Sequence, residues 1–250
     1  MASERIHLGS PDRVNPHIDE MFVRQHTADG HADAHDMLQG VPAGVDDELE
    51  IVHERVYAVR AFRRNYDTLV LRGAVRDQKP AGLYIGDDPE PLTVHHMIVD
   101  LTITVPSLEI VAVEVVLDTH PHADCRRIEA HYDKLVGLSI ARGFTHKVRE
   151  LFGGPRGCTH TTALLQAMAP VAVQSMWSFR VARARQAGND SPFAGDHREA
   201  AIASNLNSCH VWDEGGDHVA QIRTNGFVDV PVWIARRYRE LGRDPAGWRG

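Results

Sequence analysis

The chain has 250 residues with 43% hydrophobic content, and 34 acidic side chains against 27 basic ones give it a formal net charge of −7. A chain of this length can bury a real core, and it lies at the upper end of what one domain usually holds. The acidic balance argues against a nucleic acid or an anionic membrane as partner, because phosphate binding depends on clustered positive charge.

The first residues contain no apolar run of the signal-peptide type, and no segment approaches the roughly 20 apolar residues that span a bilayer. We therefore expect a cytoplasmic protein. Three cysteines, an odd number, indicate reduced thiols rather than a disulfide framework. The 16 histidines stand out, because imidazoles supply metal ligands and acid–base groups near neutral pH.

The composition of the chain changes near residue 50. Residues 1–50 are rich in Asp, His, Gly and Pro and show no sustained apolar period, so we interpret them as a polar, histidine-rich arm whose histidines are solvated. Residues 51–250 carry regular apolar patterns and are predicted to form a single α+β domain.

Strand patterns come first within that domain. Alternating, β-prone residues predict strands over 55–62 and 68–76, with turn residues at 64–67 between them. Two further strands are predicted over 92–105 and 110–117. Four antiparallel strands in sequence order are the simplest sheet that these segments can form.

Helical patterns follow the strands. Apolar spacing predicts helices over 123–136, 139–151, 159–185 and 231–241, with Pro170 expected to kink or divide the third. The predicted fold is therefore α+β, an antiparallel β meander packed by helices that follow it in sequence. The phosphate-binding glycine signatures of nucleotide-binding proteins are absent.

The most informative motif is the Gly-Gly-Pro-Arg-Gly-Cys-Thr-His stretch over 153–160. A glycine-rich loop that opens a helix presents backbone N–H groups and the positive end of the helix dipole. Cys158 at that end, with Arg156 and His160 nearby, has the setting of a nucleophile or a metal ligand. Alternatively, Cys158 is a small buried apolar residue, the glycines only end the preceding helix, and Thr159 is its cap.

Further candidates surround this motif. We predict that Gly154, Gly157 and Arg149 bind the substrate and that Arg156 anchors a carboxylate or a developing oxyanion. Alternation along the third strand places His95 on its apolar face, where it serves either as an acid–base group or as an ordinary histidine at the rim of the core.

Each cysteine has a histidine within three residues of it, which raises the possibility of a shared zinc or iron site. Its predicted ligands, besides Cys158 and His160, are His120, His122, Cys125, Cys209 and His210. The spacing matches no standard zinc finger or metalloprotease pattern. Alternatively, His120, His122 and Cys125 belong to a polar turn in which Asp124 caps the next helix.

Several of these residues carry a family resemblance. They are Arg142-Gly143-Phe144, Arg149, Gly153-Gly154 and Arg156 to His160, with His95 and Met97 upstream and Cys209-His210 downstream. The pattern, over roughly residues 50 to 215, resembles a bacterial family catalogued only as a domain of unknown function. The resemblance implies a compact bacterial protein and no particular activity.

Three functions remain open at this point. The first is a small-molecule catabolic enzyme, of the lyase or hydrolase type, with Cys158, His160, His95 and Arg156 as its catalytic groups and no cofactor. The second is a metal-binding protein with a catalytic or structural zinc or iron site. The third is a non-catalytic ligand-binding or assembly module, and a homo-oligomer is left open for all three.

Overall fold

The computed structural model describes residues 51–188, 202–203, 205–225 and 230–248. The predicted polar arm, residues 1–50, lies outside the described residues.

One four-stranded sheet forms the first half of the described chain. Its strands are β1 (Glu54–Arg63), β2 (Thr68–Lys79), β3 (Leu92–Thr104) and β4 (Ile110–Thr119). They are neighbours in the order β1-β2-β3-β4, which is the predicted meander. The turn between β1 and β2 is closed by the side chain of Asn65, whose Oδ1 accepts the N–H of Asp67 at 2.9 Å.

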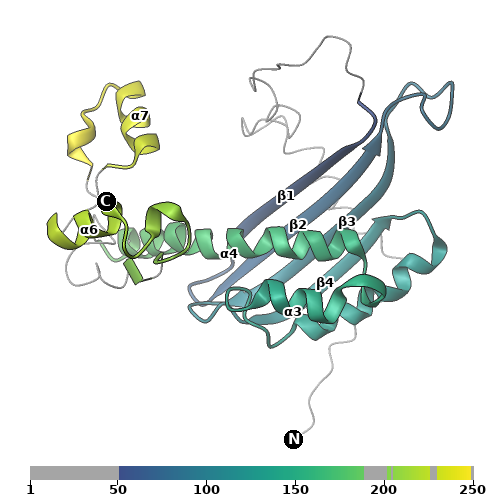
Figure 1. Ribbon diagram of the computed structural model, residues 1–250, viewed down its shortest axis with the longest axis horizontal. Helices are drawn as coiled ribbons and strands as arrows, with labels where there is room; N and C mark the ends of the chain where they lie inside the picture. Colours follow the sequence, from purple (N-terminus) through teal and green to yellow (C-terminus); the bar gives the residue numbers. More distant parts are fainter. Residues whose placement is uncertain (1–50, 189–201, 204, 226–229, 249–250) are drawn as a thin grey trace, which may run out of the picture. The chain divides into compact units, whose positions relative to one another are not determined.

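The helices follow the sheet in the chain, so the α+β prediction is confirmed (Figure 1). Their bounds are η2 (Ala123–Leu135), α3 (Phe144–Phe152), η3 (Gly154–Arg156), α4 (Thr159–Gln186), η4 (His210–Trp212), α6 (Asp217–Asn225), α7 (Val232–Glu240) and η5 (Pro245–Gly247). None of the helices in the described ranges has the length and apolar character needed to cross a membrane.

Two of the predicted helices differ from the structure in their start or their type, and the third concerns Pro170. The helix expected from residue 139 begins only at Phe144, because Ser139 forms an isolated antiparallel bridge with Glu109 and Gly143 has a φ of 64°. Residues 123–135 form a run of 3₁₀ turns rather than an α-helix. Pro170 does not divide α4, which continues through it, and the proline is exposed.

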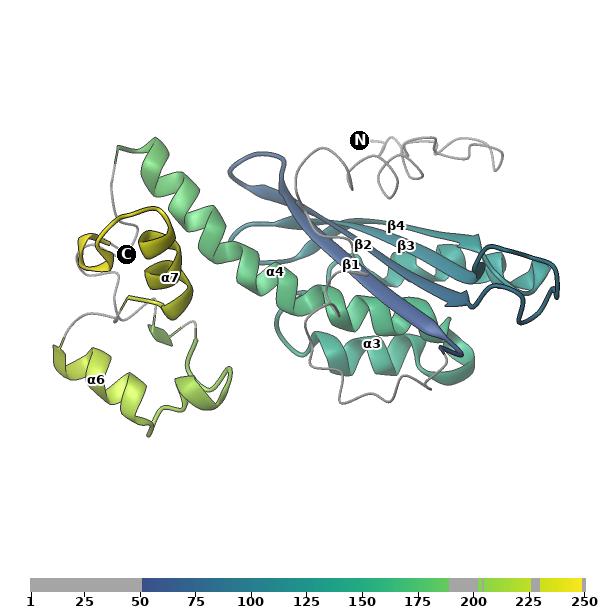
Figure 2. The same ribbon diagram turned by 90° about the horizontal axis from the view of Figure 1, so that it is seen from above.

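The core lies between one face of the sheet and the helices α3 and α4, which lie on the same side of it in two perpendicular views (Figures 1 and 2). We call this the covered face; it carries alternate residues such as Leu71, Val75 and Val99, all 0% exposed. Helix α4 approaches closely at Gly73, where a Cβ would lie 2.8 Å from the Met168 sulfur. The other face, which carries Arg72, is called the outer face.

Candidate functional site

His95 enters the site from strand β3. The alternation that places Met97 and Val99 in the core puts His95 on the covered face, near the start of the strand. His95 is partly buried, and its ring stacks on that of His160, with 3.9 Å between ring centroids and 26° between ring planes. Two of the predicted site residues, 65 positions apart, are therefore in direct contact.

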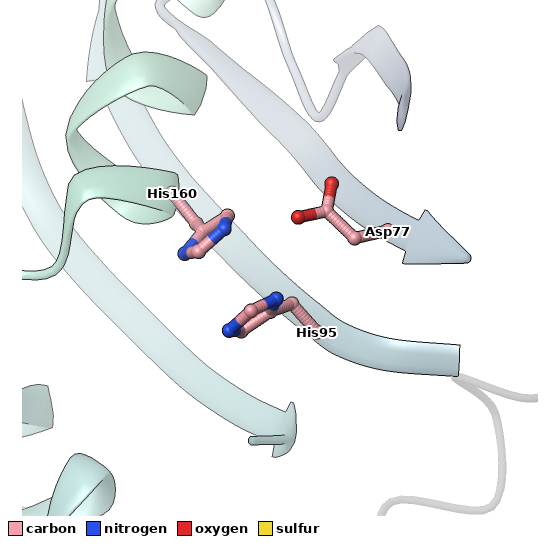
Figure 3. Close-up of side chains that lie close together, drawn as sticks. All are labelled: Asp77, His95 and His160. Carbon is pink, nitrogen blue, oxygen red and sulfur yellow. The ribbon is translucent and has the colours of Figure 1, made fainter. Parts of the chain in front are cut away.

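The third member of the group is Asp77, near the end of β2, the neighbour of β3. One donor atom each from Asp77, His95 and His160 lie within 4.8 Å of one another. Figure 3 shows the carboxylate of Asp77 turned towards the two imidazoles. We call these three residues the Asp–His–His cluster.

Asp77 was missed by the sequence analysis, which ended its strand at residue 76. The strand pattern nevertheless contained a signal that could have identified Asp77. Leu71, Gly73 and Val75 alternate along the covered face, and the next position of that face is Asp77. A carboxylate in an apolar row is unusual, and this one is only 1% exposed.

The charge of Asp77 is neutralised by Arg55 of β1. The Arg55 Nε atom donates to Oδ1 at 2.6 Å and Nη2 donates to Oδ2 at 2.7 Å, a bidentate geometry. This hydrogen bonding raises the pKa of Arg55 well above its ordinary value. The His53 Nε2 atom lies 3.8 Å from Asp77 Oδ2. The buried carboxylate is therefore hydrogen-bonded through both oxygens to a guanidinium, beside the two imidazoles.

Cys158 precedes α4 and lies beside the cluster. Its Sγ atom is 3.8 Å from Nδ1 of His160, and the residue is partly buried. Its backbone N–H donates to the hydroxyl oxygen of Tyr132 at 2.9 Å, and that hydroxyl donates to the Cys158 carbonyl at 3.4 Å. Tyr132 is 0% exposed, and burial raises its pKa. The start of α4 is thus held in place by two hydrogen bonds to Tyr132, a residue that was not predicted from the sequence.

The glycines before Cys158 are needed for close packing of backbone. A Cβ on Gly157 would lie 2.5 Å from the Phe152 carbonyl oxygen, and one on Gly153 would lie 2.4 Å from the Arg149 carbonyl oxygen. The N–H groups of Arg156 and Gly157 donate to carbonyls within the loop, each at 3.4 Å, and that of Cys158 donates to Tyr132. These three amides therefore do not form the open anion cradle that the sequence predicted.

The predicted anion anchor and substrate-binding residues lie at the end of α3. Arg156 is exposed, and its Nη2 atom donates to the Arg149 carbonyl at 3.3 Å, where it satisfies a helix-terminal acceptor. Arg149 and Gly154 are also exposed.

The five additional metal ligands predicted from the sequence are not members of the group of donors that meets in the described residues. His120 Nδ1 bonds to the carbonyl oxygen of His122 at 3.0 Å, Cys125 packs against the core, and Cys209 and His210 are exposed. Within the described ranges, only Asp77, His95 and His160 form a group with metal-binding geometry. Closeness in sequence was a poor guide to which donors meet.

The cluster offers two kinds of chemistry. One carboxylate with two imidazoles is a donor set used by catalytic zinc sites and by non-haem iron sites that keep open positions. The same side chains, without a metal, can accept and donate protons, and Cys158 adds a nucleophile beside His160.

Comparison with known proteins gives a match between part of the chain and one family model. Residues 53–174 match a family model described as "Protein of unknown function (DUF2889)". The match covers just under half of the chain and includes the sheet, the three residues of the cluster and Cys158. No curated protein and no solved structure matches the chain.

Proposed function

We propose that this protein is a small-molecule enzyme of the hydrolase or lyase type, whose reaction centre is a zinc or iron ion held by the Asp–His–His cluster. The observation that carries the proposal is the meeting of Asp77, His95 and His160 within 4.8 Å on the covered face of the sheet. Three different elements supply these side chains, so their meeting is a product of the tertiary fold.

The residues present fit a divalent transition metal. Imidazole nitrogens and a carboxylate oxygen are the preferred ligands of zinc and are common ligands of iron. Three protein ligands leave coordination positions for water and substrate. A bound ion would supply Lewis acidity and a water activated near neutral pH.

Cys158 has a supporting role in this proposal. Its sulfur faces Nδ1 of His160, which leaves the other ring nitrogen, Nε2, for the metal. Metal-binding histidines usually donate their second ring N–H to a neighbouring acceptor, and this contact fixes the tautomer and the ring orientation. The Cys158 sulfur takes that position here, and Tyr132 holds the backbone of Cys158 in place.

The 3.8 Å contact between Cys158 Sγ and His160 Nδ1 favours a second candidate function, a metal-free thiol enzyme. In that mechanism His160 removes the thiol proton, the sulfur attacks the substrate, and Asp77 orients the imidazole. The two candidates need opposite proton positions on Nδ1, so one experiment can separate them.

The test measures the metal content of the full chain purified without a histidine tag and reconstituted with zinc or with iron(II). We expect about one equivalent of metal per chain, lost in Asp77→Asn and in His160→Gln. Matched controls are Asp100→Asn on the outer face and His122→Gln at the surface, which should keep the metal. A folded wild-type chain that binds neither ion contradicts the proposal.

The thiol reaction separates the second candidate. Cys125→Ser and Cys209→Ser together leave Cys158 as the single thiol. In metal-free protein, alkylation of Cys158 by iodoacetamide that is faster than that of a model thiol, and that slows in His160→Gln, supports the thiol enzyme. Alkylation no faster than the model thiol removes this candidate.

A further inference from the structure

The charges around the Asp–His–His cluster are balanced before any ion binds. Asp77 is the one carboxylate of the cluster, and Arg55 contacts both of its oxygens. Neutral imidazoles, which metal binding requires, add no charge. The negative charge of Asp77 is therefore already matched by a permanent cation.

A metal ion does not need to displace Arg55. Each carboxylate oxygen has two lone-pair directions, so Asp77 can accept from the guanidinium and still ligate a cation. A guanidinium stays protonated in proteins, so Arg55 keeps its charge in this bidentate pair. With a divalent ion bound, Asp77, Arg55, His95 and His160 together with the ion carry a net charge of about +2, from one negative, one positive and two metal charges.

Such an excess of positive charge is costly in these surroundings. Asp77 is 1% exposed, both histidines are partly buried, and the neighbouring strand residues Val75 and Met97 are core residues. An uncompensated charge in an apolar environment is strongly unfavourable, and it attracts an anion to the open coordination positions.

We infer that the open positions of this centre select an anionic oxygen ligand, and that the substrate is a small molecule bearing a carboxylate. The inference rests on the proposed function, because the excess charge exists only when a metal is bound. Arg55, with a side chain 37% exposed, then acts as a specificity-determining residue by cancelling the charge of Asp77.

The experiment uses the full chain loaded with cobalt(II), a spectroscopic substitute for zinc or iron. Benzoate is the carboxylate probe, benzamide is its neutral counterpart of nearly equal shape, and inorganic phosphate is the alternative anion. We expect benzoate to change the visible absorption of the bound cobalt in a saturable way, with an affinity at least tenfold higher than that of benzamide.

Variants of Arg55 test the charge argument. In Arg55→Met we expect benzoate to bind about tenfold more weakly while cobalt is bound at least as tightly as before, because the site has lost one positive charge. Arg55→Lys keeps that charge and should stay within about threefold of the wild type. Arg72→Met, which removes the guanidinium paired with Asp100 on the outer face, is the matched control and should have no effect.

The outcomes are distinguishable. Cobalt binding with equal responses to benzoate and benzamide, or with no response to either, overturns this inference and leaves the proposed function standing. A response to phosphate alone overturns the carboxylate assignment. Failure of the folded protein to bind cobalt overturns the proposed function and this inference with it.

Discussion

The two faces of the sheet carry similar polar groups with different outcomes. On the covered face, Arg55 pairs with Asp77 and His95 lies beside them. On the outer face, Arg72 pairs with Asp100 through Nε and Oδ1 at 2.8 Å, and His96 lies 3.1 Å from Asp118. The side chain of Asp77 is 2% exposed, whereas that of Asp100 is 23% exposed.

The difference lies in what covers each face. The start of α4 places His160 against His95, and this supplies a third donor. Among the described residues of the outer face, no comparable group of three donors forms. An arginine–aspartate pair and a histidine therefore occur on both faces, and a third donor from another element makes a candidate site of the set on the covered face.

The largest expected effect separates His95 from His96. We expect His95→Ala to weaken zinc binding by at least 100-fold, because one of three ligands is lost. His96→Ala, one residue away on the other face, should change it by less than threefold. Competition with a chromogenic chelator measures both affinities. Equal losses of zinc affinity in the two variants would contradict the assignment of the metal site to the covered face.

The second prediction concerns the loop that delivers His160 to the covered face. Gly157→Ala should lower the free energy of unfolding by about 3 kcal/mol, because its Cβ would collide with the backbone carbonyl of Phe152. Gly86→Ala is the control, since nothing lies within 4 Å of a Cβ there. Urea denaturation measures both variants, and equal stability of the two would contradict the steric argument.

The third prediction compares the two arginine–aspartate pairs. We expect Asp77→Asn to cost about 2 kcal/mol of stability in metal-free protein, because a charged hydrogen-bonded pair is broken where the carboxylate is buried. Asp100→Asn should cost about 1 kcal/mol or less, since solvent screens the more exposed pair. Thermal unfolding at one fixed pH gives both values, and the reverse order would show that burial does not govern the difference.

The smallest expected effect is at Tyr132. Tyr132→Phe loses two hydrogen bonds to the Cys158 backbone and should cost about 1 kcal/mol. Burial raises the folded-state pKa of Tyr132 above its ordinary 10.0, so its contribution is complete below pH 10 and is lost as pH rises through the folded-state pKa. Stability measured between pH 8 and 11 should therefore fall less steeply in Tyr132→Phe than in the wild type.

Much of the fold was predictable because strand alternation is a local property. The four strands follow from period-two patterns, and the same alternation put His95 on the covered face. Their order is the simplest one for consecutive antiparallel strands, and the structure confirms it. The start of α3 was predicted too early, because the bridge between Ser139 and Glu109 is a tertiary interaction that no local pattern contains.

The site was predictable only in part. His160 and His95 were named, and the structure brings them together. Asp77 was missed because its role depends on Arg55 and on the two histidines, all from other elements. His120 and His122 were overvalued because closeness in sequence says little about whether two side chains face a common point. The contact between them joins the His120 ring nitrogen to the backbone carbonyl of His122.

The tight connection between Phe152 and Thr159 also fixes the rotational phase of α4. Gly157 packs against the Phe152 carbonyl, and the Cys158 N–H is hydrogen-bonded to Tyr132. The position at which the helix begins is therefore fixed by its neighbours. Each residue added to the first turn of a helix rotates the side chains after it by about 100°. Inserting one residue between Cys158 and His160 would thus turn the His160 imidazole away from His95. The site would be lost although all three residues of the cluster are still present in the sequence.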